Sequence, residues 1–150
     1  MQLNQAMSRG EIDAYITGGT YTVSAARLEG VSQLYAVCPE SGPADGFGGV
    51  NWIEVNSAVN NPSLHPNALD FLEYILQPES AYIVGTAGGL LQPVAQMGQP
   101  EVFDKFTADE LDAIQYETLD YRISHAVEYD IVPGEDRLMK IYGAAIRDRG

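Results

Sequence analysis

Segments with the alternating pattern of a β-strand and segments with the periodicity of an α-helix follow one another along this chain, separated by glycine and proline. Residues 13–18 and 33–37 are typical of short strands. Between them, Thr20 could cap a helix over residues 21–28 that ends near Gly30. Because helices that alternate with strands cover the faces of a sheet, the pattern predicts an α/β fold.

The rest of the chain is mostly predicted to be helical. Helical spacing of apolar residues, or a helix-start pattern, is present at residues 3–9, 67–76, 80–86, 107–110 and 134–148. The last helix is the clearest, because Glu135 and Asp136 lie in its first turn and Arg147 near its end, as the helix dipole favours. Its buried stripe is expected to consist of Leu138, Ile141, Tyr142 and Ala145. Residues 92–107 are predicted to be irregular, and residues 115–132 are ambiguous.

Composition narrows the classes of protein and of partner. With 45% hydrophobic and 19% charged residues among 150, the chain is typical of one globular domain with its own core. Twenty-one acidic and eight basic residues give a net charge of −13. Nucleic acids and anionic membrane surfaces attract basic proteins, so this charge disfavours both. It is compatible with a cationic ligand, and equally with a contribution to solubility alone.

No pattern for metal binding, cofactor binding or nucleophilic catalysis is present. The histidines, His65 and His125, lie far apart in sequence, and the single Cys38 has no convincing histidine partner. The glycine pair before Thr20 has neither the spacing of a dinucleotide-binding loop nor the lysine of a phosphate-binding loop. The sequence therefore predicts no catalytic residue, no metal and no cofactor, and the chain is not expected to be an enzyme.

The N-terminal residues and the hydropathy pattern bear on location. Residues 1–5 lack the basic and apolar parts of a signal peptide. No apolar run approaches the roughly 18 residues that cross a bilayer. Either the protein is intracellular, or its natural N-terminus lies further upstream.

Trp52 and Glu54 form the best candidate binding feature. They lie two residues apart in residues 50–55, which alternate like a strand, so both side chains are expected on one face. An indole attracts a cation and a carboxylate supplies the opposite charge, which together suit an amine. The preceding residues 41–49 are rich in glycine and proline, as hinges are. The alternative is an exposed glutamate beside a half-buried tryptophan at a sheet edge.

The turn at Gly18-Gly19 is a second candidate. It follows a predicted strand and opens a helix, so its free N–H groups could bind an anion such as a ligand carboxylate. The alternative is a plain tight turn. Tyr21 stands just past this turn, at the carboxyl end of the predicted strand, where open α/β sheets bind their ligands.

Three of these segments together resemble the spermidine/putrescine-binding proteins of ABC transporters. Residues 10–21 are similar to a strand, turn and helix of that family. Residues 49–54 follow a glycine-rich hinge as they do in the family, and residues 67–78 are similar to a family helix that ends in a proline-containing turn. The resemblance covers nearly the whole chain and is strongest over residues 10–98.

The resemblance implies part of a two-lobed clamshell, the type II fold of periplasmic binding proteins. This chain would match only the C-terminal half of that fold, and the N-terminal half of the family fold would be absent from it. Residues 1–51 and 99–150 would belong to the C-terminal lobe, and residues 52–98 to the N-terminal lobe. The family further implies a periplasmic location, with the signal peptide outside this chain, and ABC permease subunits as membrane partners. A homodimer of the fragment could cover exposed sheet edges.

The resemblance also implies a set of site residues. Trp52 matches a family tryptophan that packs on the polyamine, and Glu54 stands where the family has an aspartate that pairs with an amine. Thr17, Gly19, Thr20 and Tyr21 would line the opposite wall. Ile16 and Leu90 stand where polyamine binders have aromatic side chains. These two departures favour another small amine or an amino-acid-like solute.

The first functional hypothesis is therefore a solute-binding component that binds a small cationic or zwitterionic molecule, such as a polyamine or related amine. Two further hypotheses remain. One is a small cytoplasmic α/β enzyme or ligand-sensing domain, complete in 150 residues. The other is an interaction module without a small ligand, which a buried Trp52 would favour.

Overall fold

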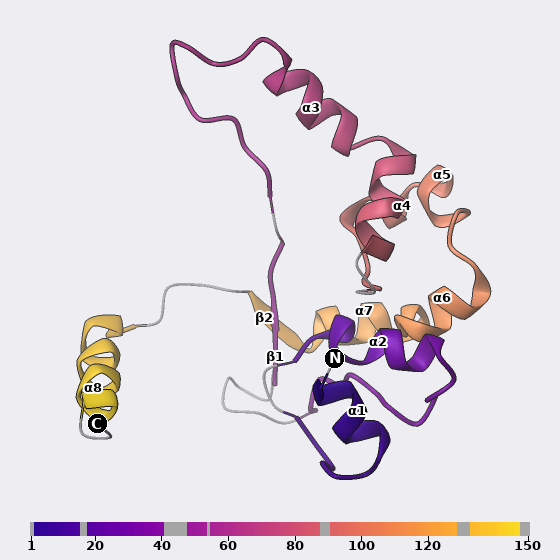
Figure 1. Cartoon of the computed structure of the whole chain (residues 1–150), viewed down its shortest axis with the longest axis vertical. Helices are drawn as coiled ribbons and strands as arrows, with labels where there is room; N and C mark the ends of the chain where they lie inside the picture. The colour runs from indigo at the N-terminus through magenta and orange to yellow at the C-terminus, as the bar shows by residue number, and fades with distance from the viewer. Residues whose placement is uncertain are drawn as a thin grey trace.

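The computed structural model describes residues 2–15, 18–40, 48–53, 55–87, 91–128 and 133–147 as a series of helices joined by loops, with one pair of short strands (Figure 1). The α-helices are α1 (Gln2–Ser8), α2 (Thr20–Leu28), α3 (Asn67–Ile75), α4 (Pro78–Thr86), α5 (Pro100–Phe103), α6 (Ala108–Ala113), α7 (Leu119–Ser124) and α8 (Glu135–Arg147). The 3₁₀ helices are η2 (Ala95–Gly98) and η3 (Tyr116–Thr118), and the strands are β1 (Gly49–Asn51) and β2 (Ala126–Glu128). The described part of the chain is thus a mixture of helix and sheet, and it does not show a two-lobed clamshell.

The helix predictions are confirmed for α1, α2, α3, α4, α6 and α8. Helix α2 begins one residue earlier than predicted, with Gly19 in the cap position and Thr20 as its first residue, and Gly30 after it lies in the left-handed region, with φ of +100°. Helix α6 begins with a capping box: the Thr107 hydroxyl accepts from the N–H of Glu110, and the Glu110 carboxylate accepts from the N–H of Thr107. Local capping and turn chemistry therefore determine where these helices begin and end.

The strands β1 and β2 run parallel, with Gly49 opposite Ala126 and Asn51 opposite Glu128. A methyl group at Gly49 would collide with the sulfur of Cys38 and would lie 3.2 Å from the Cβ of Ala126. Glycine at this position therefore lets the segment that ends at Cys38 pack directly against β1. The sequence did not predict β2, because its partner β1 lies far away along the chain.

The predicted strand at residues 33–37 is wrong, because these residues form no ladder with another strand. Polar side chains bind their backbone instead. The guanidinium of Arg27 donates to the carbonyl oxygens of Ser32 and Leu34 at 2.7 and 2.8 Å, and the amide of Gln115 both accepts from the N–H of Ala36 and donates to its carbonyl oxygen. Arg27 from α2 and Gln115, which lies between α6 and η3, thus supply the hydrogen-bond partners that a neighbouring strand would otherwise provide.

Two other strand predictions also need correction. Residues 13–15 form no strand, and residues 16–17 lie outside the described residues, as does the hinge segment at 41–47. The strand predicted over residues 50–55 ends at Asn51, so Trp52 and Ile53 are not part of a ladder. Alternation indicates which residues could share a face, but a strand also needs a partner for its backbone.

The main hydrophobic core lies where α4, α5 and α6 meet. Its buried members are Ala81, Leu91, Met97, Val102, Phe106, Ala113 and Ile114. A smaller cluster of Val23, Ala26 and Leu34 packs under α2. The hydroxyl of Ser24, fully buried on α2, donates to the carbonyl oxygen of Leu91 and so joins the two clusters. The main core combines side chains from residues 52–98, assigned to one lobe by the resemblance, with side chains from residues 99–150, assigned to the other.

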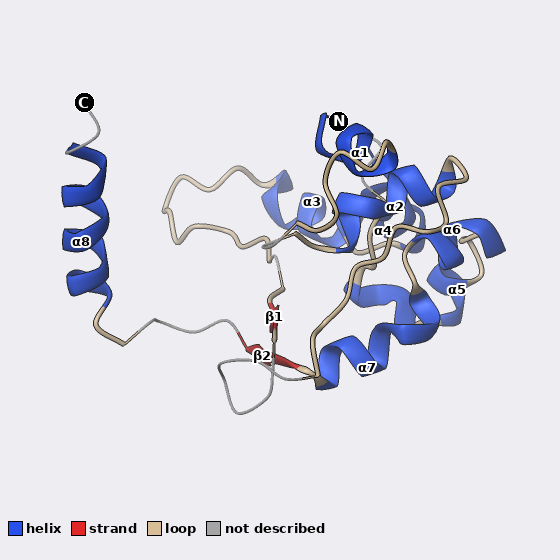
Figure 2. Ribbon diagram, turned by 90° about the horizontal axis from the view of Figure 1, so that it is seen from below, coloured by secondary structure: helices blue, strands red, loops and turns tan. Residues whose placement is uncertain are grey.

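The predicted burial of the α8 stripe is wrong. Leu138, Ile141 and Tyr142 are each more than half exposed, and Ala145 is exposed too. Figures 1 and 2 show α8 standing apart from the other helices. Helix α3 also has no fully buried residue: its Leu69 and Phe71 are exposed, as is Leu76 just after it, and Ala68, Leu72 and Ile75 are half-buried. Periodicity correctly identifies an apolar face on each helix, but the described residues leave that of α8 exposed and cover that of α3 only in part.

Among the described helices, none has the length and apolar character needed to cross a bilayer.

The packing at Gly49 leads to a stability prediction. Gly49→Ala should lower the free energy of unfolding by about 1–3 kcal/mol, because the new methyl group forces Cys38 away from β1. Chemical denaturation measures this change. Gly98→Ala is the matched control, since a methyl group there meets nothing within 4 Å, and its unfolding free energy should stay close to that of the wild type. Equal stability of the two variants would contradict the packing.

Candidate functional site

The turn at Gly18-Gly19 is bordered by two tyrosine rings. A methyl group at Gly18 would lie 2.9 Å from the ring of Tyr15, and one at Gly19 would lie 2.6 Å from the ring of Tyr21. The N–H of Gly19 donates to the hydroxyl of Thr22 at 3.1 Å, which fixes the turn at the start of α2. Glycine thus lets the rings approach the turn closely, and aromatic surface lies beside the first amide groups of α2. The sequence did not predict a role for Tyr15.

Thr20, the first residue of α2, is held by Arg122 from the last turn of α7. One terminal nitrogen of the guanidinium donates to the Thr20 hydroxyl. The other donates to the carbonyl oxygens of Ile114 at 2.9 Å and of Gln115 at 2.8 Å. A single side chain therefore binds the N-terminus of α2, the C-terminal end of α6 and α7 together.

The charge of Arg122 is not balanced by a carboxylate in the described part of the chain. The ion pairs there belong to Arg9, Arg27 and Lys105. Removal from water lowers the pKa of the Arg122 guanidinium, and its buried Nε makes no hydrogen bond with the described residues. A guanidinium stays protonated in proteins, so a positive charge lies next to Thr20.

Trp52 lies immediately after β1 and its side chain is 54% exposed. The preceding residue, Asn51, donates from its side-chain amide to the carbonyl oxygen of Ile123 at 3.0 Å. Strand β1 is therefore attached to α7 as well as paired with β2. An exposed indole does not meet the condition that would favour an interaction module without a small ligand.

Helix α7 thus connects the two predicted walls of the site through successive residues. The side chain of Arg122 binds Thr20, and the backbone of Ile123 binds Asn51, the residue before Trp52. The described contacts include none between Trp52 and Thr20, so the walls are linked through α7.

Two predicted site residues, Thr17 and Glu54, lie outside the described residues, as do Ile16 and Leu90. Arg122 was missed by the sequence analysis because residues 115–132 gave no clear pattern, and Asn51 was missed because its partner, Ile123, lies in that same segment. The available signal was an isolated arginine in a strongly acidic chain.

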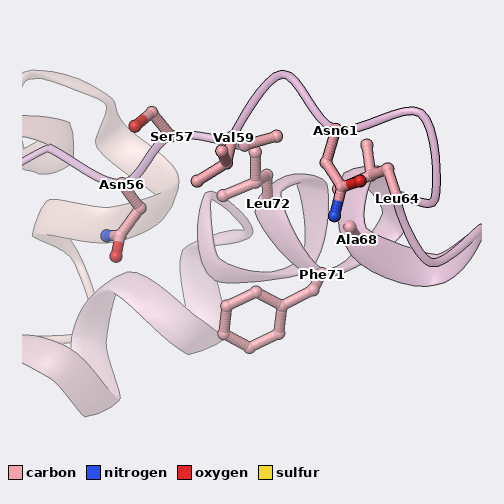
Figure 3. Close-up of a pocket in the computed structure, with 9 residues that line it drawn as sticks. Asn56, Ser57, Val59, Asn61, Leu64, Ala68, Phe71 and Leu72 are labelled. Carbon is pink, nitrogen blue, oxygen red and sulfur yellow. The ribbon is translucent and has the colours of Figure 1, made fainter.

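A separate groove lies between α3 and the extended segment before it (Figure 3). Its volume is about 290 Å³, and it is lined mainly by apolar side chains, among them Val59, Leu64, Phe71 and Leu72. It includes none of the predicted site residues. In the described ranges, no group of three or more histidine, cysteine, aspartate or glutamate residues could hold a metal ion.

Comparisons with protein-family models, with curated proteins and with solved structures gave no match. The function is therefore inferred from the residues and their geometry.

Gln115 supports this site and leads to a second stability prediction. It adopts a left-handed backbone conformation, with φ of +55°, and its amide makes two hydrogen bonds to the backbone of Ala36. Gln115→Glu should lower the free energy of unfolding by about 1–3 kcal/mol, because the carboxylate cannot donate to the carbonyl oxygen of Ala36. Chemical denaturation at neutral pH measures the loss.

Gln96→Glu is the matched control, since no described residue accepts a hydrogen bond from the Gln96 side chain. If both variants lost the same stability, the Gln115–Ala36 pair would have no special role.

Proposed function

We propose that this chain is part of the substrate-binding component of an ABC transporter and binds a small cationic or zwitterionic solute without transforming it. The observation that carries the proposal is the attachment of both predicted walls to α7. Arg122 holds Thr20 at the start of α2, and Ile123 holds the strand that leads to Trp52. Two segments far apart in sequence are thereby fixed in relation to each other, as a binding site requires.

The chemistry of one wall suits an amine. The exposed indole of Trp52 offers an aromatic face that attracts a cation. The net charge of −13 adds a long-range attraction for a positively charged solute. Glu54, assigned to this wall on sequence alone, would pair with the ligand nitrogen.

The other wall consists of Gly19, Thr20 and Tyr21, with Thr17 assigned to it on sequence alone. The hydroxyl of Thr20 and the first amide groups of α2 offer polar contacts. The rings of Tyr15 and Tyr21 lie beside them. These rings supply aromatic surface near the wall in which Ile16 replaces an aromatic residue of the polyamine-binding family.

The exposed apolar faces of α3 and α8 support a place within a larger, two-lobed assembly. A contiguous exposed apolar face normally indicates a contact with further protein. Figure 1 shows that the chain runs from β1 along an extended path to α3, away from α2, α6 and α7. In the proposal, the segment beginning at Trp52 leads into the second lobe, and closure of the lobes on the ligand excludes water and strengthens the polar contacts.

Transport adds two further proposals. The loaded protein would deliver its solute to ABC permease subunits in the membrane, and it would act in the periplasm.

Truncation of Trp52 tests the proposal. The protein has a single tryptophan, so its tryptophan fluorescence, excited selectively over that of the tyrosines, reports on this wall alone. Binding of putrescine or γ-aminobutyrate should change the fluorescence, and Trp52→Ala should weaken binding by about tenfold or more in calorimetry, as expected for loss of a cation–π contact.

Tyr74→Ala is the control, because it removes an equally exposed aromatic ring from α3, outside the proposed site. Unchanged affinity in Trp52→Ala would refute the assignment of this wall.

A further inference from the structure

We propose that Arg122 makes the Thr20 wall select a negatively charged, hydrogen-bond-accepting group, so that the ligand is a zwitterion with its amine at Trp52 and its carboxylate at Thr20. A diamine of the same length would be discriminated against. The inference rests on the proposed function, because it takes these two walls as opposite ends of one binding site.

The direction of the hydrogen bond at Thr20 is fixed by chemistry. A guanidinium has donors and no acceptor, so the Thr20 hydroxyl must accept from Arg122. A hydroxyl that accepts in this way keeps its own hydrogen for another partner. Thr20 therefore presents a donor, which suits the oxygen of a carboxylate.

The positive charge of Arg122 at this wall also favours a carboxylate over an ammonium group. Arg122 is partly withdrawn from water, and no carboxylate of the described residues pairs with it. Partial burial leaves a charge less screened than one at the surface. An ammonium group placed at Thr20 would be repelled by the guanidinium, whereas a carboxylate would be attracted.

The start of α2 adds to this preference. The first amide groups of a helix have no acceptor within it, and the aligned peptide dipoles place partial positive charge there. Thr20 is the first residue of the nine-residue α2. The guanidinium of Arg122, which forms no ion pair with the described residues, is an independent source of positive charge at the same point, and the indole of Trp52 provides the contrasting end for the amine.

A matched pair of ligands tests the inference directly. Putrescine and γ-aminobutyrate are both short chains with polar ends, but one end is an ammonium in the first and a carboxylate in the second. Calorimetry on the full chain should show γ-aminobutyrate binding about tenfold or more tightly than putrescine, the gain expected for one charge-assisted hydrogen bond.

Two variants locate the cause of the preference. Arg122→Met should abolish it, mainly by weakening the binding of γ-aminobutyrate. Thr20→Val should reduce it in the same direction, and this variant leaves the hydrogen bonds from Arg122 to Ile114 and Gln115 in place. If Arg122→Met fails to fold, as circular dichroism would show, Thr20→Val decides the outcome.

The results separate the inference from the proposed function. Equal or tighter binding of putrescine by the wild type, or a preference that both folded variants retain, would overturn the inference while the proposed function stands. If neither ligand binds and the fluorescence of Trp52 is unaltered, the proposed function and the inference fail together.

Discussion

The hydrogen bonds of the Arg122 guanidinium link the start of α2, the end of α6 and α7 through a single side chain. Its two terminal nitrogens reach the start of α2 and the carbonyl oxygens at the end of α6, while its own backbone belongs to α7. The next residue, Ile123, receives the side chain of Asn51 and so brings in β1. This connection relates the glycine turn before α2 to the strand that leads to the exposed Trp52, and the proposed site depends on it.

Much of the fold was predictable where local chemistry decides it. The glycine before α2, the capping box at Thr107 and the proline that opens α4 each mark a helix start from neighbouring residues alone. The strands were harder, because a strand requires a partner that local sequence does not reveal. Residues 33–37 have the pattern of a strand, but the side chains of Arg27 and Gln115, not a neighbouring strand, form hydrogen bonds with their backbone. Strand β2 lay in a segment without clear periodicity.

The candidate site, too, was predictable only where local sequence identifies a residue. Trp52, Gly19, Thr20 and Tyr21 could be selected by residue type and by position relative to predicted elements. Arg122 could not, because its importance comes from contacts with residues 102 positions and seven to eight positions away. The exposure of the α8 stripe was also beyond prediction, since periodicity defines an apolar face but not what covers it. That exposed face is consistent with the proposal that the chain is part of a larger binding protein.

The most direct test of the link through α7 is a double-mutant cycle between the two walls. Thr20→Val removes the contact with Arg122, and Asn51→Leu removes the contact with Ile123. If α7 couples the walls, the unfolding free energies of the two single variants and the double variant should be non-additive by at least about 0.5 kcal/mol. Additive effects would show that the two walls are independent, and the account of a single site held together by α7 would be wrong.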